Sequence, residues 1–111
     1  MKVYKGDVVY PIVPIHPPYA HVQGGMRPYV VVSNDVGNYH SNICLVVPLT
    51  TAIKKDLPTH ANISGVRRET ALCEQVFTIS QDNISRVVRK LPLSDVKKIQ
   101  RCLKIAMGIE S

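Results

Sequence analysis

Short apolar runs separated by turn-forming residues constrain the fold of this chain most strongly. The runs are rich in valine, isoleucine and leucine, and glycine, proline, asparagine or aspartate stands between most of them. Runs of this length and composition are typical of β-strands, and the residues between them are typical of turns. The sequence therefore predicts strands at residues 8–10, 29–33, 43–49, 61–63, 71–79 and 85–91, with a turn at 34–38.

The last segment changes its apolar period from that of a strand to that of a helix. Ser94 is a good N-cap residue, and Asp95 suits the positive first turn of a helix that ends near Gly108. The residues expected to face the sheet recur at helical spacing, and they are Val96, Ile99, Leu103, Ala106 and Met107. The sequence thus predicts a mainly β fold, a small barrel with a C-terminal α-helix, in a single domain over residues 1–111.

A long loop rich in proline and glycine, residues 11–27, leads into the second predicted strand. Gly24 and Gly25 favour a turn, and Pro28 biases Arg27 toward an extended backbone at the mouth of that strand. A guanidinium carries a permanent charge and a fork of donors, which suits a phosphate or a carboxylate. Arg27 is therefore a candidate anion-binding residue, with a simple surface ion pair as the alternative.

Composition and charge narrow the class of protein. The chain has 111 residues and a net charge of +6, which favours an anionic partner such as nucleic acid or an acidic protein segment. No apolar run approaches the roughly 20 residues of a membrane span, and the lysines near the start are not followed by a signal-peptide core. We therefore expect no membrane association and a cytoplasmic location. Cys44, Cys73 and Cys102 form no C-x-x-C pair, so we expect reduced core thiols and no metal site.

Several motifs, taken in order, resemble one known family. They are Lys5 to Tyr10, His21 to Pro28 followed by Val30 to Asp35, Val47 to Thr51, Leu57 to His60 and Glu74 to Ile79. This set resembles the MazF/PemK toxins of bacterial toxin–antitoxin systems. The resemblance implies an SH3-like small barrel of the MazF/PemK/CcdB type, usually a homodimer, and a cognate antitoxin that covers the active site.

The resemblance also implies an activity. Members of the family are sequence-specific, metal-independent endoribonucleases that cut single-stranded mRNA and need no cofactor. Attack of a ribose 2′-OH on the neighbouring phosphorus would leave a 2′,3′-cyclic phosphate and a 5′-OH.

The same resemblance assigns roles residue by residue. Arg27 and Thr50 match the family's catalytic arginine and threonine, and His21 matches a position where some members carry a histidine tied to catalysis. On physical grounds His21 is a better proton carrier than Arg27, whose pKa is too high for a general base. The residues expected to contact RNA are Gln23, Gly24, Gly25, Thr51, Lys54, Lys55, His60, Glu74 and Gln75.

The chain also departs from the family pattern. Val22 stands where many members have glutamate, and Phe77 and Ser80 stand where many have arginine and aspartate. We expect the loss of that arginine to change the preferred RNA sequence, and Phe77 could serve either base stacking or the core. Two alternatives remain open from the sequence: a CcdB-like toxin that binds gyrase without cutting RNA, and an inactive barrel that binds only RNA or an antitoxin.

Overall fold

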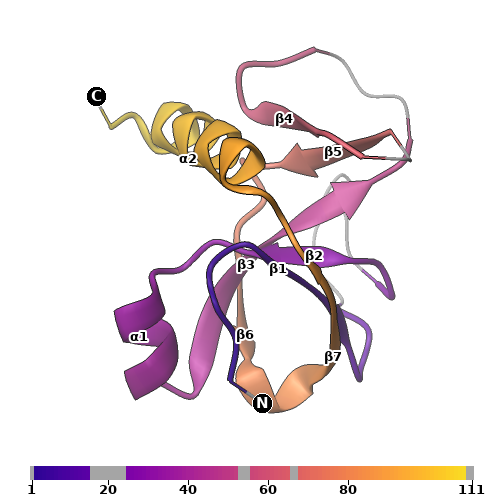
Figure 1. Ribbon diagram of the computed structural model, residues 1–111, viewed down its shortest axis with the longest axis vertical. Helices are drawn as coiled ribbons and strands as arrows, with labels where there is room; N and C mark the ends of the chain where they lie inside the picture. The colour runs from indigo at the N-terminus through magenta and orange to yellow at the C-terminus, as the bar shows by residue number, and fades with distance from the viewer. Residues whose placement is uncertain (1, 16–24, 53–55, 66–67, 110–111) are drawn as a thin grey trace.

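The computed structural model of the protein describes residues 2–15, 25–52, 56–65 and 68–109, and a twisted antiparallel sheet with two helices makes up this part (Figure 1). In chain order the elements are β1 (Asp7–Pro11), β2 (Tyr29–Val31), α1 (Asp35–His40), β3 (Ile43–Thr50), β4 (His60–Ile63), β5 (Glu69–Leu72), β6 (Phe77–Ser80), the short 3₁₀ helix η1 (Gln81–Asn83), β7 (Ile84–Lys90) and α2 (Leu93–Met107).

The long strand β3 organises the sheet. The strand order is β4-β5-β3-β2-β1-β7, and β6 pairs with the first half of β3 while β5 pairs with its end. Apolar side chains therefore point to both sides of β3 and feed two core clusters. One cluster contains Val47 and Leu49 and packs against α2, and the other contains Val46 and Tyr29. The mainly β, barrel-like fold with a C-terminal helix is confirmed.

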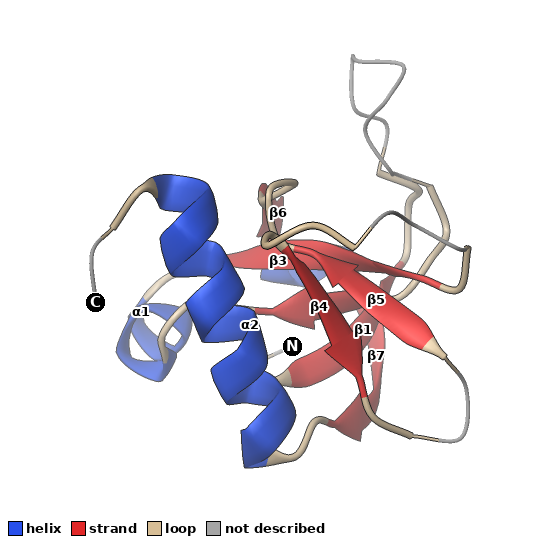
Figure 2. Ribbon diagram, turned by 90° about the horizontal axis from the view of Figure 1, so that it is seen from above, coloured by secondary structure: helices blue, strands red, loops and turns tan. Residues whose placement is uncertain are grey.

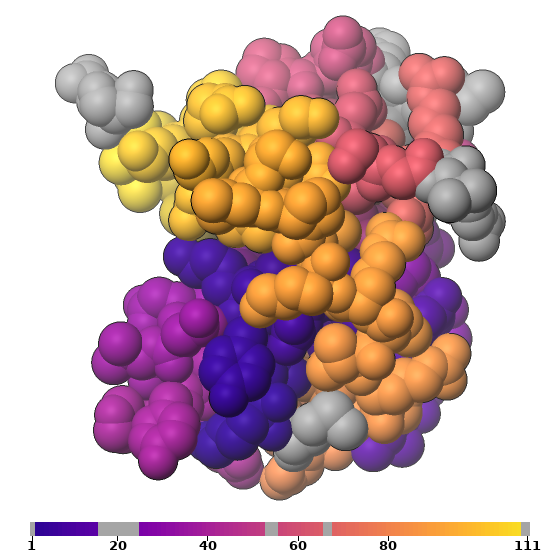
Figure 3. Space-filling view, in the orientation of Figure 1, coloured from indigo at the N-terminus to yellow at the C-terminus, as the bar shows by residue number. Residues whose placement is uncertain are grey.

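The strand ladder does not close among the described residues, because its path ends at β4 on one side and at β7 on the other. An ion pair links β7 to β5 across this opening, since Nη2 of Arg89 donates to Oε1 of the buried Glu69. β7 pairs only with β1 in the described part of the chain, and most of its residues are exposed. Figure 3 shows part of this strand, in orange, at the surface.

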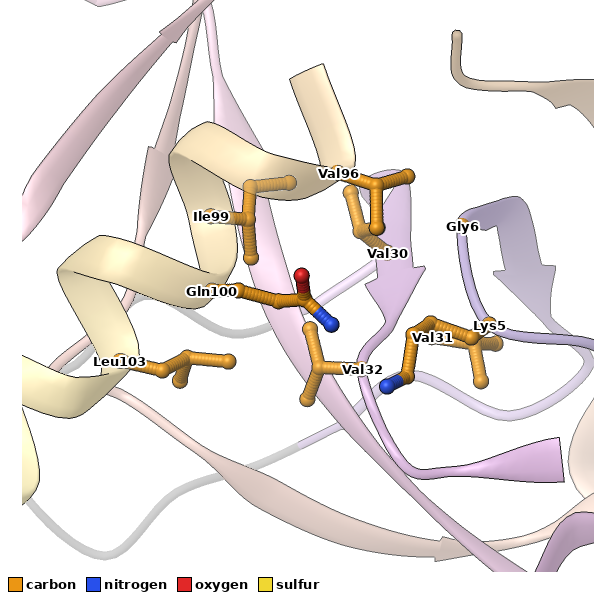
Figure 4. Close-up of a pocket in the computed structure, with 9 residues that line it drawn as sticks. All are labelled: Lys5, Gly6, Val30, Val31, Val32, Val96, Ile99, Gln100 and Leu103. Atoms are coloured by element: carbon orange, nitrogen blue, oxygen red, sulfur yellow. The ribbon is translucent and has the colours of Figure 1, made fainter. Parts of the chain in front are cut away.

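Helix α2 covers one side of the sheet and lies next to β4 (Figure 2). Gly6 permits this close approach, because a Cβ at Gly6 would lie 3.0 Å from Cγ2 of Val96, and its φ of +90° suits glycine. The cavity between α2 and β2 has a volume of only about 10 Å³, and most of the residues that line it in Figure 4 are apolar, with Lys5 and Gln100 as the polar members. Such a space holds at most about one water molecule, so this side of the sheet is packed core.

Helix α2 differs in detail from the prediction. It begins at Leu93 with Pro92 as the cap residue, so the predicted Ser94 cap is wrong. Asp95 is buried because its carboxylate accepts hydrogen bonds from the hydroxyl (2.7 Å) and the backbone N–H (3.3 Å) of Ser64, beyond the end of β4. The predicted end near Gly108 is confirmed by the left-handed backbone there.

The outer turns of α2 are less buried than predicted. Ile99 is buried and Val96 and Leu103 pack against the core, but Ala106 and Met107 are exposed because the helix extends past the sheet. No helix within the described ranges has both the length and the apolar character needed to cross a membrane.

Two other segments correct the sequence-based prediction. The expected turn at 34–38 is instead the start of α1, because the side chain of Asn34 accepts a hydrogen bond from Gly37 N–H (2.7 Å) and caps a helix. The expected single strand at 71–79 is two strands, β5 and β6. A turn in which Gln75 N–H donates to the carbonyl of Leu72 (3.1 Å) separates them.

Candidate active site

Arg27 lies between two anchored residues. On its N-terminal side, Gly25 forms an isolated bridge with Ile15, and its carbonyl accepts a hydrogen bond from the hydroxyl of Tyr29 (3.2 Å). On its C-terminal side, the carbonyl of Pro28 accepts from Leu49 N–H (2.9 Å). The backbone of Arg27, which is half-buried, is thus held at both ends.

The register of β2 and β3 places Arg27 opposite Thr50. Tyr29 pairs with Pro48 in this ladder, and the hydrogen bond from Leu49 to Pro28 continues the same register by one residue. One further step sets Arg27 across from Thr50. Directly opposite residues of an antiparallel pair point to the same face with Cβ atoms about 5 Å apart. The ladder itself ends at Tyr29 and Pro48, and Arg27 lies in a bend just beyond it, so this alignment brings the two predicted catalytic residues to the same end of β2 and β3, although 22 residues separate them in the chain.

The hydroxyl of Thr50 is suited to hydrogen-bond donation. Thr50 is the last residue of β3 and is 7% exposed. Its Oγ1 accepts a hydrogen bond from Ala52 N–H (3.1 Å), which fixes the side chain and uses the oxygen as the acceptor. The hydroxyl hydrogen can then point to a further acceptor, such as an oxygen of a phosphate group.

A row of polar side chains continues from Thr50 across the sheet. Thr50 pairs with Thr70 of β5, and Thr70 pairs with Asn62 of β4, so the three side chains share one face. The hydroxyl of Thr70 donates to Oδ1 of Asn62 (3.3 Å). This face is opposite to the one that packs on α2, because the intervening residues Leu49, Ala71 and Ala61 belong to the α2 core.

A second row lies beside the first on the same face, and His60 ends it. By the same registers this row consists of Tyr29, Pro48, Leu72 and His60. The first three are buried and form an apolar floor, and the ring of Phe77 packs edge-on against Tyr29 with centroids 6.1 Å apart. Phe77 therefore belongs to the core in this structure.

His60 and Glu74 form a pair on this face, with His60 Nε2 3.0 Å from Oε1 of Glu74. Burial pushes the pKa of Glu74 upward, but hydrogen bonds from its own backbone and from His60 and Thr59 outweigh this and lower it. Glu74 is thus held as a carboxylate. Thr59 was missed by the sequence reasoning, although its place directly before His60 was a signal.

The remaining predicted site residues divide into two groups. Gly25, Thr51 and Gln75 are described: Gly25 anchors the base of the loop, Thr51 is exposed just past β3, and Gln75 lies half-buried in the turn after β5. The others lie outside the described residues, and they are His21, Gln23, Gly24, Lys54 and Lys55.

Three other features of the described residues are weaker candidates for a functional site: the buried cysteines, a metal-binding cluster and a groove beside α2. Burial raises the pKa of the Cys44 thiol to about 11 and is the main cause that raises the pKa of Cys73 to about 12, so neither suits a nucleophile. The described residues contain no cluster of three or more histidine, cysteine, aspartate or glutamate side chains able to hold a metal ion. An open groove of about 460 Å³ beside α2 is lined by Lys97, Arg101, Lys104 and apolar neighbours, on the other side of the sheet from Thr50.

Comparison with known proteins points to one family. Residues 4–107 match the family described as PemK-like, MazF-like toxin of type II toxin–antitoxin system. The chain is 32% identical to Endoribonuclease EndoA of Bacillus subtilis (strain 168), and the alignment covers 98% of this chain and 97% of that protein. It is 27% identical to Endoribonuclease MazF of Staphylococcus saprophyticus, with 96% and 92% covered. Among solved structures, an endoribonuclease in complex with its cognate antitoxin from Mycobacterial species is similar in fold, with a TM-score of 0.81, 20% identity and 98% of both chains covered.

Proposed function

Because this chain belongs to the PemK-like, MazF-like toxins of type II toxin–antitoxin systems, we propose that it is a sequence-specific endoribonuclease that cleaves single-stranded mRNA. The observation that supports the proposal is the β2–β3 register, which, continued past Tyr29 and Pro48 through the hydrogen bond from Leu49 to Pro28, aligns Arg27 with Thr50. The relatives named endoribonuclease EndoA and endoribonuclease MazF support the same activity. The proposal treats residues 1–111 as one toxin domain.

The proposed reaction is an internal transfer at phosphorus. The ribose 2′-oxygen forms a bond to the adjacent phosphorus, the bond from phosphorus to O5′ breaks, and a 2′,3′-cyclic phosphate and a 5′-OH result. Charge builds up on the non-bridging oxygens as the bond forms. Arg27 would stabilise this charge with its guanidinium donors, and Thr50 would donate its hydroxyl hydrogen to the same group.

Proton transfer is assigned to His21. The 2′-OH must lose a proton and O5′ must gain one, and a histidine with an ordinary pKa of about 6.5 can do both near neutral pH. We expect the pH–rate profile of His21→Gln to lose the limb that titrates near that pKa. A profile identical to wild type would remove His21 from the mechanism.

The proposed partners are single-stranded mRNA and a cognate antitoxin protein. A similar fold has been solved as an endoribonuclease in complex with its cognate antitoxin, which supports the second partner. The family resemblance further supports a homodimer, to be measured by analytical ultracentrifugation, and a cytoplasmic location. The net charge of +6 fits an RNA substrate, so we expect affinity to fall as salt concentration rises.

The test is cleavage of a mixed-sequence single-stranded RNA in EDTA by wild type and by Arg27→Ala. We expect discrete cuts with cyclic phosphate ends from wild type, and no cuts from an Arg27→Ala protein that melts at a similar temperature. Absence of cleavage by wild type over a broad set of RNAs would overturn the proposal. It would direct the search to gyrase binding or to RNA binding without catalysis.

A further inference from the structure

The row of polar side chains that starts at Arg27 and Thr50 ends at Asn62, a residue with no role in the proposed reaction. Asn62 is the outer member of the row, on the terminal strand of the described ladder, and it is exposed. Strands lie about 4.8 Å apart, so Asn62 of β4 is about 10 Å from Thr50 of β3, with β5 between them. A base near the scissile phosphate, but not at it, can reach this position.

Thr70 gives the amide of Asn62 a defined orientation. The Thr70 hydroxyl, itself only 8% exposed, donates to Oδ1 of Asn62 at 3.3 Å. With Oδ1 engaged by that donor, the exposed amide presents its Nδ2 hydrogens. Oδ1 keeps a second lone pair, but the Nδ2 hydrogens are the groups of the amide that Thr70 leaves unengaged, and donors distinguish bases by their acceptors.

A cation lies beside the same residue. Nζ of Lys98 is 3.4 Å from the backbone carbonyl of Asn62, at the outer edge of β4, and its side chain is 45% exposed. Lys98 reaches this edge from α2 and also pairs with Asp95 (3.7 Å), so it helps to hold the β4 backbone that carries Asn62.

We propose that Asn62, oriented by Thr70, is a specificity-determining residue that reads the base of one nucleotide next to the cleavage site. The donors of the amide match the keto oxygens O4 of uracil and O6 of guanine. Cytosine and adenine present amino donors, N4 and N6, at the corresponding positions and are disfavoured. This inference rests on the proposed ribonuclease activity and extends it to the choice of substrate sequence.

The test is the cut-site profile on a randomised single-stranded RNA library. For wild type we expect one position near the cut at which uracil or guanine is preferred over cytosine or adenine by about tenfold. In Asn62→Leu this preference should disappear while cleavage continues. In Asn62→Asp, which presents only acceptors, it should shift toward cytosine or adenine.

Two further variants sharpen the test. Thr70→Val keeps the shape of the side chain but frees Oδ1, so the amide can turn and discrimination at that one position should weaken. Asn34→Asp is the matched control. It adds the same charge at the exposed N-cap position of α1, where an aspartate side chain can also accept the capping hydrogen bond. Its profile should equal that of wild type.

The outcomes separate the two proposals. Profiles of active Asn62→Leu and Asn62→Asp proteins that match wild type at every position would overturn the role of Asn62 and leave the ribonuclease proposal intact. A wild-type protein that cuts no RNA would overturn the ribonuclease proposal and this inference with it.

Discussion

Tyr29 connects the candidate site to the core at the scale of single residues. Its ring is fully buried beneath Phe77, while its hydroxyl donates to the carbonyl of Gly25 at the base of the loop. Burial raises the pKa of Tyr29 to about 12, although the charge of Arg27 nearby acts in the opposite direction. The phenol is therefore a fixed, neutral donor that positions the segment before Arg27.

Tyr29→Phe tests this role. Loss of the hydroxyl should lower the free energy of unfolding by about 1 kcal/mol near neutral pH. The tyrosine ionises at 10.0 in the unfolded chain but only at about 12 in the folded one, so its contribution is lost as pH rises through that window. Denaturant unfolding of both proteins from pH 8 to pH 12 should show the advantage of wild type shrinking above pH 10. A constant difference over that range would contradict this account.

The pair of His60 and Glu74 predicts that the free energy of unfolding changes with pH in the acid range. The folded pKa of Glu74 is lowered from 4.5, so its contribution is present above that value and is lost as pH falls through the lower folded pKa. Because Glu74 is partly exposed, the effect should be no more than about 1 kcal/mol.

Glu74→Gln should remove that part of the acid dependence, measured as the free energy of unfolding between pH 6 and pH 3. Asp82→Asn, at an exposed carboxylate of η1, is the control for the loss of a charge. If the curves of wild type and Glu74→Gln run parallel, the carboxylate is not stabilised by this pair.

At the scale of elements, the packing of α2 against the N-terminal segment depends on Gly6. The carbonyl of Gly6 accepts from Leu91 N–H and its own N–H donates to Val31, so the backbone is held at the point where α2 approaches. An added Cβ would meet Val96 at 3.0 Å and would force a left-handed backbone on an L-residue.

We expect Gly6→Ala to lower the free energy of unfolding by about 2 kcal/mol, measured by denaturant titration. Gly37→Ala is the matched control, because Gly37 lies inside α1, its φ is not positive and its Cβ would only touch Asn34 at 3.4 Å. That variant should be neutral or slightly more stable, since alanine favours helix. Equal losses in both variants would mean that Gly6 has no special packing role.

The elements also show what the sequence could and could not reveal. The strand over Ile43–Thr50 was predictable because an unbroken apolar run of that length suits a central strand. The break between β5 and β6 was not, because the residues on both sides are apolar and only their pairing with opposite ends of β3 separates them. Helix α1 was read as a turn because asparagine and glycine favour turns and helix caps alike.

At the scale of the whole molecule, the candidate site lies on the face of the sheet that is turned away from α2. The face toward α2 is filled with the first core cluster, and the opposite face carries Thr50 and His60 beside the second cluster, which contains Tyr29. Arg27 was a candidate from its local pattern and from the family resemblance, and Thr50 from the resemblance alone, but their alignment depends on strand register, which local pattern does not determine. Thr70 and Asn62 were missed for the same reason. Nothing in their local sequence marks them, and only the registers of β2, β3, β5 and β4 place them in one row with Thr50.

The measurement that tests this account most directly is a double-mutant cycle on Arg27→Ala and Thr50→Val, read out as single-turnover cleavage of one RNA. If both side chains stabilise the same phosphoryl group, each variant should lose about 100-fold or more, and the double variant should lose little beyond the worse single. Thr78→Val, at an exposed threonine of β6, should cleave like wild type. Losses that multiply in the double variant, or an Arg27→Ala protein as active as wild type, would contradict a shared phosphate site.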